Sequence, residues 1–239
     1  MIWKNGKKKA LTLSYDDAII HDRRFIELLK KYGINCTFNI NSGWLNDKEE
    51  DVDYSKEPCE ERKHIKVSRD EVKSLYGDFE VASHAVHHPN LVGMPKNEVY
   101  SEIKDDVKAL SEMTGQSVKG FAYPYGAYDD ELIERLADCG IVYARTVNST
   151  HGFGLPERFL AWHPTCHHND EKLFDLAKEF IESKDEGLLF YLWGHSYEFY
   201  MDKNWDVIEK FLALMAEHKD EIWMATNIEI YDYVMENRD

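Results

Sequence analysis

Short apolar segments alternate with amphipathic segments along almost the whole chain, and this alternation restricts the possible folds more than any other feature. "ALTLSY" is followed by the helix-like "RRFIELLKKYG" and then by "NCTFNI", and such pairs continue to "IEIYDYVME" near the C-terminus. Apolar runs rich in β-branched and aromatic residues predict strands, whereas apolar residues at every third or fourth position predict helices. Repeated strand–helix units form a mostly parallel sheet that helices cover.

The number of units favours a closed or nearly closed barrel over an open sheet. Roughly six or seven strand–helix units follow one another, and no linker rich in Pro, Gly or Ser separates them within the 239 residues. We therefore predict one α/β domain spanning residues 1–239. Two segments, 44–66 and 146–168, show no clear periodicity, and loops of this length in a compact domain are often functional.

Composition and charge argue against several kinds of partner. The chain is 43% hydrophobic and 13% aromatic, as expected of a packed globule, and its formal net charge is −16. Because this charge would repel phosphate backbones and anionic lipids, we expect neither a nucleic acid nor a membrane partner. The four cysteines form no CxxC pair, and the N-terminus lacks the apolar run of a signal peptide, so we expect a cytoplasmic protein. The oligomeric state is not predicted.

Polar residues gather where the predicted strands end. In parallel α/β folds the reacting groups collect at the C-terminal ends of the strands. The residues at five such ends are Asp16 with Asp17, His84 with His87 and His88, the segment Pro124–Gly126, Arg145, and His195. Ordinary surface polarity would not favour strand ends so consistently, so we predict an active site at this edge.

His84 and His88 are candidate metal ligands. Pro89 disfavours helical backbone at His88, so a loop that turns both rings inward is expected. Two neutral imidazoles and one carboxylate are enough to hold a catalytic Zn²⁺ or a similar divalent ion, with positions left for water. Solvated loop histidines are the alternative for this spacing alone. The carboxylate pair at the end of an earlier strand favours the metal.

A metal also accounts for two adjacent carboxylates at the end of a strand. Consecutive strand side chains point to opposite sides, so Asp16 and Asp17 need not share one role. One of them can bind the cation while the other faces the water that the cation polarises. The cation offsets the repulsion between the carboxylates and makes that water acidic near neutral pH.

These motifs together resemble the polysaccharide deacetylase family, carbohydrate esterase family 4, over nearly the whole chain. "SYDDA" stands for the family's T/S-F/Y-D-D-G, "HAVHH" for H-S/T-x-x-H, "AYPYG" for R-x-P-Y/F-G, and "WGH" for L-x-H. One motif would be weak support, but four in the right order at strand ends are strong support. The resemblance implies a distorted, incomplete (β/α)7 barrel with mostly parallel strands.

The resemblance also implies a role for each matched residue. Asp16 resembles the general base, His195 the general acid, and the backbone N–H of Tyr125 an oxyanion donor. The residues that resemble the metal ligands are Asp17, His84 and His88. The implied reaction is attack of metal-activated water on the acetyl group of an N-acetylated or O-acetylated sugar. One divalent ion is expected, Zn²⁺ first, with Co²⁺, Ni²⁺ or Mn²⁺ as alternatives.

The chain departs from the family pattern at several positions. Ala18 and Ala85 replace a glycine and a hydroxyl residue, and Ala122 replaces the arginine that usually steadies the base. We expect Arg145, at the end of the next strand, to supply that missing charge. Trp193 stands where a smaller aliphatic residue normally lines the acyl pocket, which leaves the acyl group open.

Further substrate-binding candidates lie near these motifs. They are Pro124 and Trp193 within the motifs, and Trp162 and His163 in the segment "LAWHPTCHHND". The spacing of the histidines and the cysteine from 163 to 168 matches no common zinc pattern. Tyr197 and Tyr200 are interpreted as packing aromatics more readily than as sugar-stacking surfaces. His21, His64 and His218 are expected at the surface.

Two other functions remain open. The first alternative is a related hydrolase of another C–N bond, in a small amide or ureide. The second is a non-catalytic, metal-retaining carbohydrate-binding protein. The presence of both Asp16 and His195 argues against a binder, which needs neither base nor acid. A cytoplasmic enzyme would meet a small glycoside or oligosaccharide rather than a polymer.

Overall fold

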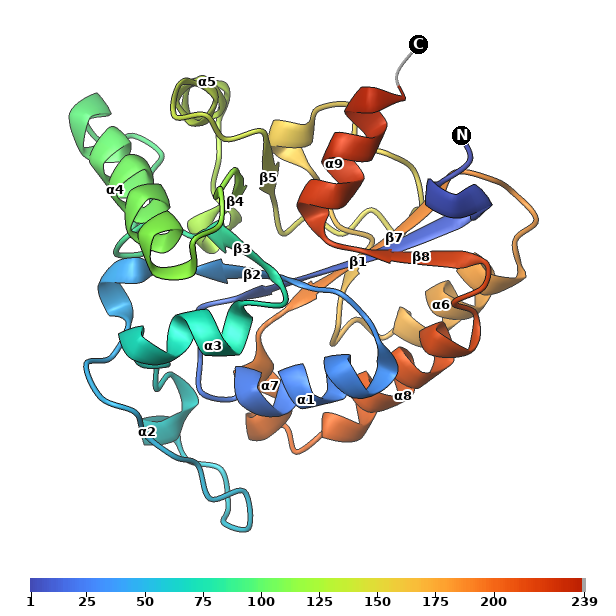
Figure 1. The fold of residues 1–239 in the computed structure, drawn as a ribbon, viewed down its shortest axis with the longest axis horizontal. Helices are drawn as coiled ribbons and strands as arrows, with labels where there is room; N and C mark the ends of the chain where they lie inside the picture. Colours follow the sequence, from blue (N-terminus) through green and yellow to red (C-terminus); the bar gives the residue numbers. More distant parts are fainter. Residues whose placement is uncertain (238–239) are drawn as a thin grey trace.

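One parallel sheet flanked by helices forms the protein, whose computed structural model describes residues 1–237 (Figure 1). The strands are β1 (Lys9–Asp16), β2 (Thr37–Ile40), β3 (Glu80–Ser83), β4 (Gly120–Ala122), β5 (Tyr143–Arg145), β6 (Cys166–His167), β7 (Leu188–Gly194) and β8 (Ile222–Ala225). Their order is β5-β4-β3-β2-β1-β7-β6, with β8 also paired to β1. All of these pairings are parallel, as the strand–helix alternation predicts.

Strand β1 is the central strand of the sheet. All of its residues are buried, and it pairs with three other strands. Strand β7 pairs with one edge of β1 over residues 9–15. The opposite edge pairs with β8 over residues 9–12 and with β2 over residues 14–16. Two strands thus share one edge of β1, and β5 and β6 form the two ends of the strand order. The predicted distorted, incomplete barrel is confirmed.

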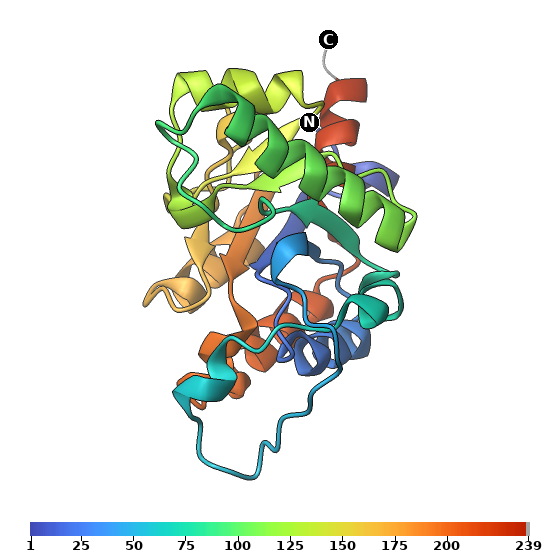
Figure 2. The same cartoon turned by 90° about the vertical axis from the view of Figure 1, so that its left-hand side faces the viewer.

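Helices cover both faces of the sheet. They are α1 (Asp22–Tyr32), α2 (Glu60–Lys63), α3 (Val72–Tyr76), α4 (Lys96–Thr114), α5 (Asp130–Asp138), α6 (Leu173–Glu182), α7 (Ser196–Met201), α8 (Trp205–Glu217) and α9 (Asn227–Glu236). In Figure 1, α4, α5 and α9 lie on one side of β1, and α1, α3, α6, α7 and α8 lie on the other. The loop that carries α2 projects away from this body, as Figure 2 shows.

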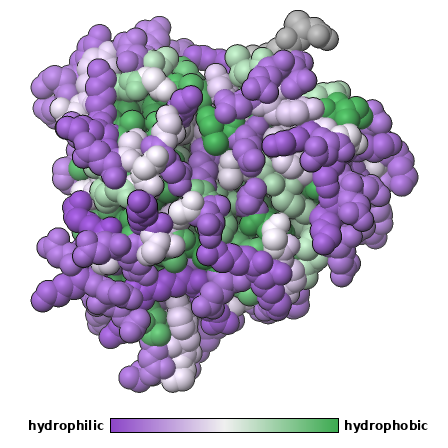
Figure 3. All heavy atoms as spheres, in the orientation of Figure 1, coloured by the Kyte–Doolittle hydropathy of each residue, from purple (hydrophilic) through white to green (hydrophobic). Residues whose placement is uncertain are grey.

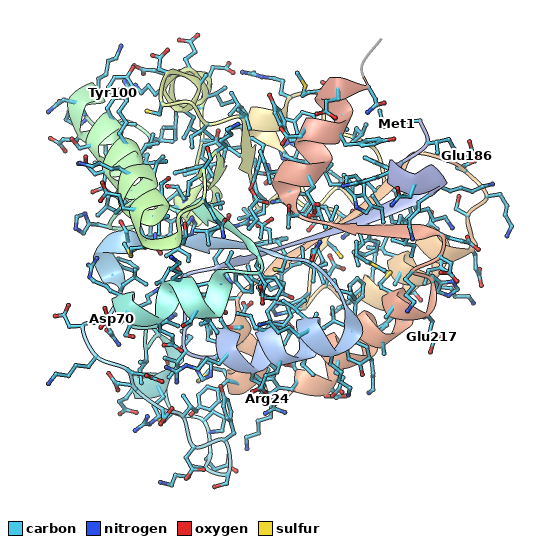
Figure 4. All side chains as sticks on the ribbon, viewed as in Figure 1. Met1, Arg24, Asp70, Tyr100, Glu186 and Glu217 are labelled. Carbon is cyan, nitrogen blue, oxygen red and sulfur yellow. The ribbon has the colours of Figure 1, made fainter. Side chains whose placement is uncertain are left out.

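The largest apolar core lies between the sheet and the helices packed around α1 and α8. Leu11 and Leu13 of β1 and Phe190 of β7 are fully buried there with Phe25 of α1 and Phe211 of α8. The outside is mostly hydrophilic on the face drawn in Figure 3, and labelled side chains such as Asp70 and Tyr100 point outward in Figure 4. Among residues 1–237, no helix has the length and apolar character needed to cross a bilayer.

Three local features differ from the sequence-based expectations. Helix α7 directly follows His195, and strand β6 lies within the segment 146–168. Both are too short for periodicity to reveal them. His21, which was expected at the surface, is instead fully buried, with its ring stacked 4.3 Å from that of Tyr200.

Candidate active site

The C-terminal ends of several strands border one cavity of about 970 Å³. Asp16 and Asp17 come from the end of β1, His84 follows β3, and His195 follows β7. Much of the remaining wall is aromatic and comprises Trp44, His64, Tyr123, Tyr125, Trp193 and Tyr197. The polar residues at the predicted strand ends therefore do meet around one cavity.

Strained backbone gathers around this cavity. Eight non-glycine residues among residues 1–237 have positive φ, and five of them, Asp17, Ala18, Ala85, His88 and Tyr125, belong to the three motif loops. Such conformations cost of the order of 1–3 kcal/mol each and cluster at functional sites. Ala18 adopts φ 49° although it lacks the freedom of the family's glycine. The turn after the two aspartates therefore has an alanine in the left-handed region in this chain.

Asp17, His84 and His88 form a cluster suited to a divalent cation. One ligand atom from each residue lies within 4.8 Å of the others. The backbone carbonyl of Ala122 lies 2.8 Å from Nδ1 of His84. Since a carbonyl only accepts, this nitrogen carries the proton and Nε2 keeps its lone pair for a metal. Oδ1 of Asp17 is buried without a hydrogen-bond partner, as expected of a ligand atom.

The protonation states also fit metal binding. Burial lowers the pKa of His84 to about 4 and lowers the pKa of His88 as well, so both rings are neutral near pH 7. Burial raises the pKa of Asp17, but Lys66 and the surrounding imidazoles outweigh this and lower it to about 2. A carboxylate and two neutral imidazoles are the forms that bind metal ions.

His87 faces away from the cluster. Its ring is exposed, and its Nδ1 lies 2.8 Å from Oε1 of Glu102. His88, by contrast, lies edge-on to His84 with ring centroids 4.5 Å apart. The geometry therefore selects His88, the residue that the motif alignment predicts, over its neighbour.

Asp106 on α4 holds the loop that carries His84. Its Oδ2 accepts from the hydroxyl of Ser83 at 2.6 Å and from the backbone N–H of His84 at 3.2 Å. Its Oδ1 accepts from the N–H of Ser42 at 2.8 Å. Nothing in the local sequence marks this residue, because helix packing alone brings it to the site.

Asp16 lies beside the cluster as a buried, ionised carboxylate. Its Oδ1 accepts from Asn39 at 2.7 Å, and its Oδ2 contacts the guanidinium of Arg145. Burial raises the pKa of Asp16, but Arg145 and the nearby imidazoles lower it by a larger amount. The pKa of Asp16 is therefore below its usual value. An ionised carboxylate here can accept a proton from water.

Arg145 reaches the site through Asp16 and Trp193. Its guanidinium stacks on the Trp193 ring, with Cζ 4.4 Å from the ring centroid, and it does not line the cavity. Arg145 therefore contacts both the carboxylate of Asp16 and the ring of Trp193. Its location fits a residue that positions the carboxylate of Asp16.

We expect Arg145→Met to weaken both the fold and the base. Leaving buried Asp16 unpaired should cost about 3 kcal/mol of unfolding free energy, measured by urea denaturation. Because Arg145 lowers the pKa of Asp16, the acidic limb of the pH–rate profile should move to higher pH. Arg145→Lys, which keeps the charge, should shift it less. Unchanged stability, activity and metal content in Arg145→Met would contradict this role.

His195 lies between Asp16 and Glu198 of α7, with one ring nitrogen toward each carboxylate. Its Nε2 lies 3.7 Å from Oδ2 of Asp16, and its Nδ1 lies 3.3 Å from Oε2 of Glu198. Burial lowers the pKa of His195, but the hydrogen bond to Glu198 and the charge of Asp16 raise it above the usual value overall. A proton-carrying imidazole near neutral pH can act as a general acid.

Two further imidazoles converge on Glu198. Nε2 of His167 lies 3.1 Å and Nε2 of His168 lies 3.2 Å from its Oε2. The N–H of Asn169 donates to Nδ1 of His167, so a neutral His167 carries its proton on Nε2 and donates to Glu198. His167, His195 and Glu198 also lie close enough for a metal site, but this tautomer leaves no lone pair on Nε2 of His167.

We expect Glu198→Gln to move the alkaline limb of the pH–rate profile to lower pH. Glu198 raises the pKa of His195, so its loss lets the imidazole deprotonate at lower pH. The measurement is kcat/KM for acetate release from pH 5 to 10. Asp202→Asn, a change one turn further along and outside the cavity wall, serves as the matched control. An unmoved alkaline limb would show that Glu198 does not act through His195.

The other predicted substrate-binding residues divide into two groups. Trp193 lines the cavity, as expected. Trp162 does not, because its ring is buried between Tyr143 and Tyr191 in a separate core cluster. Neither His163, whose Nδ1 lies 2.6 Å from the hydroxyl of Thr146, nor buried Pro124 is part of the cavity wall. None of these three residues borders the cavity, so their contacts with a substrate stay predictions.

Several residues of the cavity wall lie outside the sequence motifs and were not predicted as site residues. They are Trp44, His64 and Lys66 from the long segment 44–66, together with Tyr197 of α7. His64 is exposed as expected, but it faces the cavity mouth. Trp44 lies 5.5 Å from the His88 ring, and Tyr125 lies edge-on to the same ring at 4.5 Å.

Fold and site together define an incomplete-barrel protein of the carbohydrate esterase type. A profile of the polysaccharide deacetylase family matches residues 4–144, more than half of the sequence. The chain belongs to that family, which confirms the resemblance of the motifs, and this membership supports a carbohydrate deacetylase. Among curated proteins, none matches the sequence.

Solved structures share the fold at low sequence identity. A polysaccharide deacetylase-like protein from Mycobacterium smegmatis aligns with a TM-score of 0.67 and 17% identity, over 99% of this chain and 93% of that one. A family 4 carbohydrate esterase from Streptomyces lividans, in complex with acetate, aligns at 0.56 and 13%, over 92% and 93%. A family 4 pseudoenzyme from Bacillus anthracis aligns at 0.59 and 17%, over 96% and 67%.

Proposed function

We propose that this protein is a metal-dependent hydrolase that removes acetyl groups from N-acetylated or O-acetylated sugars. One observation carries the proposal: the cluster of Asp17, His84 and His88 lies beside a carboxylate and an imidazole that face each other. Oδ2 of Asp16 is 3.7 Å from Nε2 of His195 and 3.8 Å from Nε2 of His84. A base, an acid and a cation site thus border the same cavity.

The cation site would supply a Lewis acid for the proposed reaction. Asp17, His84 and His88 would hold one divalent ion, which as a Lewis acid polarises the acyl oxygen and lowers the pKa of nearby water. Imidazole and carboxylate ligands suit Zn²⁺ first and also Co²⁺, Ni²⁺ or Mn²⁺.

The chain's own groups move the protons. Asp16 takes a proton from the attacking water, and Arg145 and Asn39 keep this carboxylate ionised and oriented. The N–H of Tyr125 donates to the oxyanion, with the left-handed backbone at this residue (φ 58°) setting its direction. His195, steadied by Glu198, gives a proton to the leaving amine or alcohol, so acetate and the free sugar group are released.

The cavity wall supports a carbohydrate substrate. Tyr125 is 68% exposed and Trp44 is 40% exposed, so these two aromatic residues of the cavity wall are accessible to a ligand. Trp193 adds a bulky ring to the cavity wall, and a ring of this size beside the acyl group would favour a small acyl group such as acetyl. A bulkier acyl chain would meet the ring that supports Arg145.

The pseudoenzyme from Bacillus anthracis makes a non-catalytic binder the second candidate. Against it stands the complete set of base, acid and three ligand residues in this chain. The test is acetate release from chitooligosaccharides and acetylxylan after adding back Zn²⁺, Co²⁺, Ni²⁺ or Mn²⁺ to the metal-free protein. Turnover with any of these ions supports the deacetylase. Sugar binding without turnover would support the binder, and turnover of ureides alone would support the other C–N hydrolase.

A further inference from the structure

Two lysines approach the cavity from the segment that precedes β3, in a chain whose net charge is −16. Lys66 is only 8% exposed and lines the cavity, with Nζ 5.0 Å from the centroid of the Trp44 ring. Lys63 is not part of the cavity wall, but its Nζ lies 5.2 Å from the ring of Tyr197, which is, and 3.6 Å from the exposed Glu60. Each ammonium thus lies over an aromatic ring of the cavity wall.

The acids around the cavity already have cationic partners. Asp16 is paired with Arg145, and Glu198 is paired with His195. Asp17 is paired with Lys66, whose Nζ lies 3.5 Å from Oδ1 of Asp17. These pairs leave no excess of negative charge at the cavity. A divalent ion bound by Asp17 would therefore add net positive charge, and it would weaken the ion pair between Asp17 and Lys66. A buried ammonium without a counterion is costly, so a loaded site favours an anion beside Lys66.

Lys66 also has hydrogen-bonding capacity to spare. An ammonium group has three N–H donors. One reaches the backbone carbonyl of Asp17 at 2.9 Å. The 3.5 Å separation from Oδ1 of Asp17 is too long for a good hydrogen bond, and that oxygen has no partner. Two donors therefore remain for an oxygen of a ligand in the cavity.

We propose that Lys66, assisted by Lys63, forms a subsite for an anionic group on the substrate, a carboxylate or a phosphate. This inference rests on the proposed function and narrows it: the substrate is an acidic acylated sugar rather than a neutral one. The anionic group lies beside Asp17, where the Lys66 ammonium reaches the metal cluster. It replaces Asp17 as the partner of the Lys66 ammonium.

Ligand binding tests the subsite without depending on turnover. Zinc-loaded Asp16→Asn protein is titrated calorimetrically with neutral N-acetylglucosamine, with N-acetylmuramic acid as the carboxylate probe, and with N-acetylglucosamine 6-phosphate as the phosphate probe. One added charge-assisted hydrogen bond should make an acidic probe bind about 10- to 100-fold more tightly than the neutral sugar. Whichever acidic probe binds more tightly identifies the anion.

Variants of Lys66 then assign the preference to this residue. Adding Lys66→Met or Lys66→Gln should abolish the preference, Lys66→Arg should keep most of it, and Lys63→Met should reduce it less. Thermal melting and zinc content show that each variant is folded and loaded, and Lys66→Gln serves if Lys66→Met does not fold. Equal affinity for all three sugars, no binding of either acidic probe, or a preference that survives the loss of Lys66 would overturn the subsite.

The two proposals fail in different ways. If the wild type releases acetate from neutral and acidic sugars equally well, the deacetylase stands and the subsite does not. If no sugar is deacetylated while the acidic probes still bind through Lys66, the subsite stands and the deacetylase does not.

Discussion

Asp16→Asn is expected to lower acetate release by about 100- to 10,000-fold, the usual contribution of a general base. The amide can still accept a hydrogen bond from Arg145, but it cannot take a proton from water. Asp16 is not one of the three clustered ligand residues, so the zinc content should stay the same. The measurements are initial rates of acetate release at saturating zinc and metal analysis of the same protein.

Stability must be followed in the same variant, because Arg145 then loses its charged partner inside the protein. Asp70→Asn, a neutral-for-charged change at an exposed position, controls for the overall change in charge. Asp16→Asn that remains folded, binds zinc and retains more than about a tenth of the wild-type rate would contradict the role of Asp16 as base. Loss of zinc together with activity would instead place Asp16 among the ligands.

The strand-end residues could be predicted because a parallel sheet brings its C-terminal ends to one edge, whatever lies between them. Asp16, His84 and His195 meet in this way although 68 and 111 positions separate them along the chain. The pairing of β1 with β2 and β7, and of β2 with β3, aligns these strand ends, and short apolar runs were sufficient to reveal the strands themselves.

The supporting residues could not be predicted in the same way. Asp106 lies on α4 and Lys66 in a long loop, so only tertiary packing brings their side chains to the site. Glu198 carries a weak local signal, since it stands three residues after His195 at the start of a helix, where acids often bond back to the backbone. Its Oε2 does accept from the N–H of His195 at 3.1 Å.

Trp162 shows what a sequence reading based on residue type alone leaves out. A tryptophan close to a histidine-rich segment is a natural wall for a sugar site, but the backbone of Trp162 forms a parallel bridge with Arg145. This pairing directs its ring into the aromatic cluster with Tyr143 and Tyr191. The exposed aromatic residues of the cavity are instead Tyr125, which a motif covers, and Trp44, which lies in a long loop without a motif.

Replacing a clustered ligand residue should have the largest effect on metal binding. We expect His84→Gln to weaken zinc binding by more than about 100-fold, because losing partners outside the ligand set alone costs about 10- to 100-fold. His84 is almost fully buried, and the Ala122 carbonyl fixes its ring, so water cannot easily take its place. Zinc affinity is measured by competition with a chromophoric chelator, and acetate release should fall in proportion to bound zinc.

Two neighbouring variants make this a test of geometry rather than of histidine content. His87→Gln removes an imidazole three residues away that pairs with Glu102, and it should leave zinc affinity unchanged. Asp106→Asn keeps all three ligands but loosens the His84 loop, so it should weaken zinc binding by about 10- to 100-fold. If His87→Gln loses zinc and His88→Gln keeps it, the ligand set is misassigned. If His84→Gln binds zinc as tightly as the wild type, the metal lies elsewhere. The proposed base, Asp16, and the proposed acid, His195, would then have no metal-activated water and no polarised acyl group beside them.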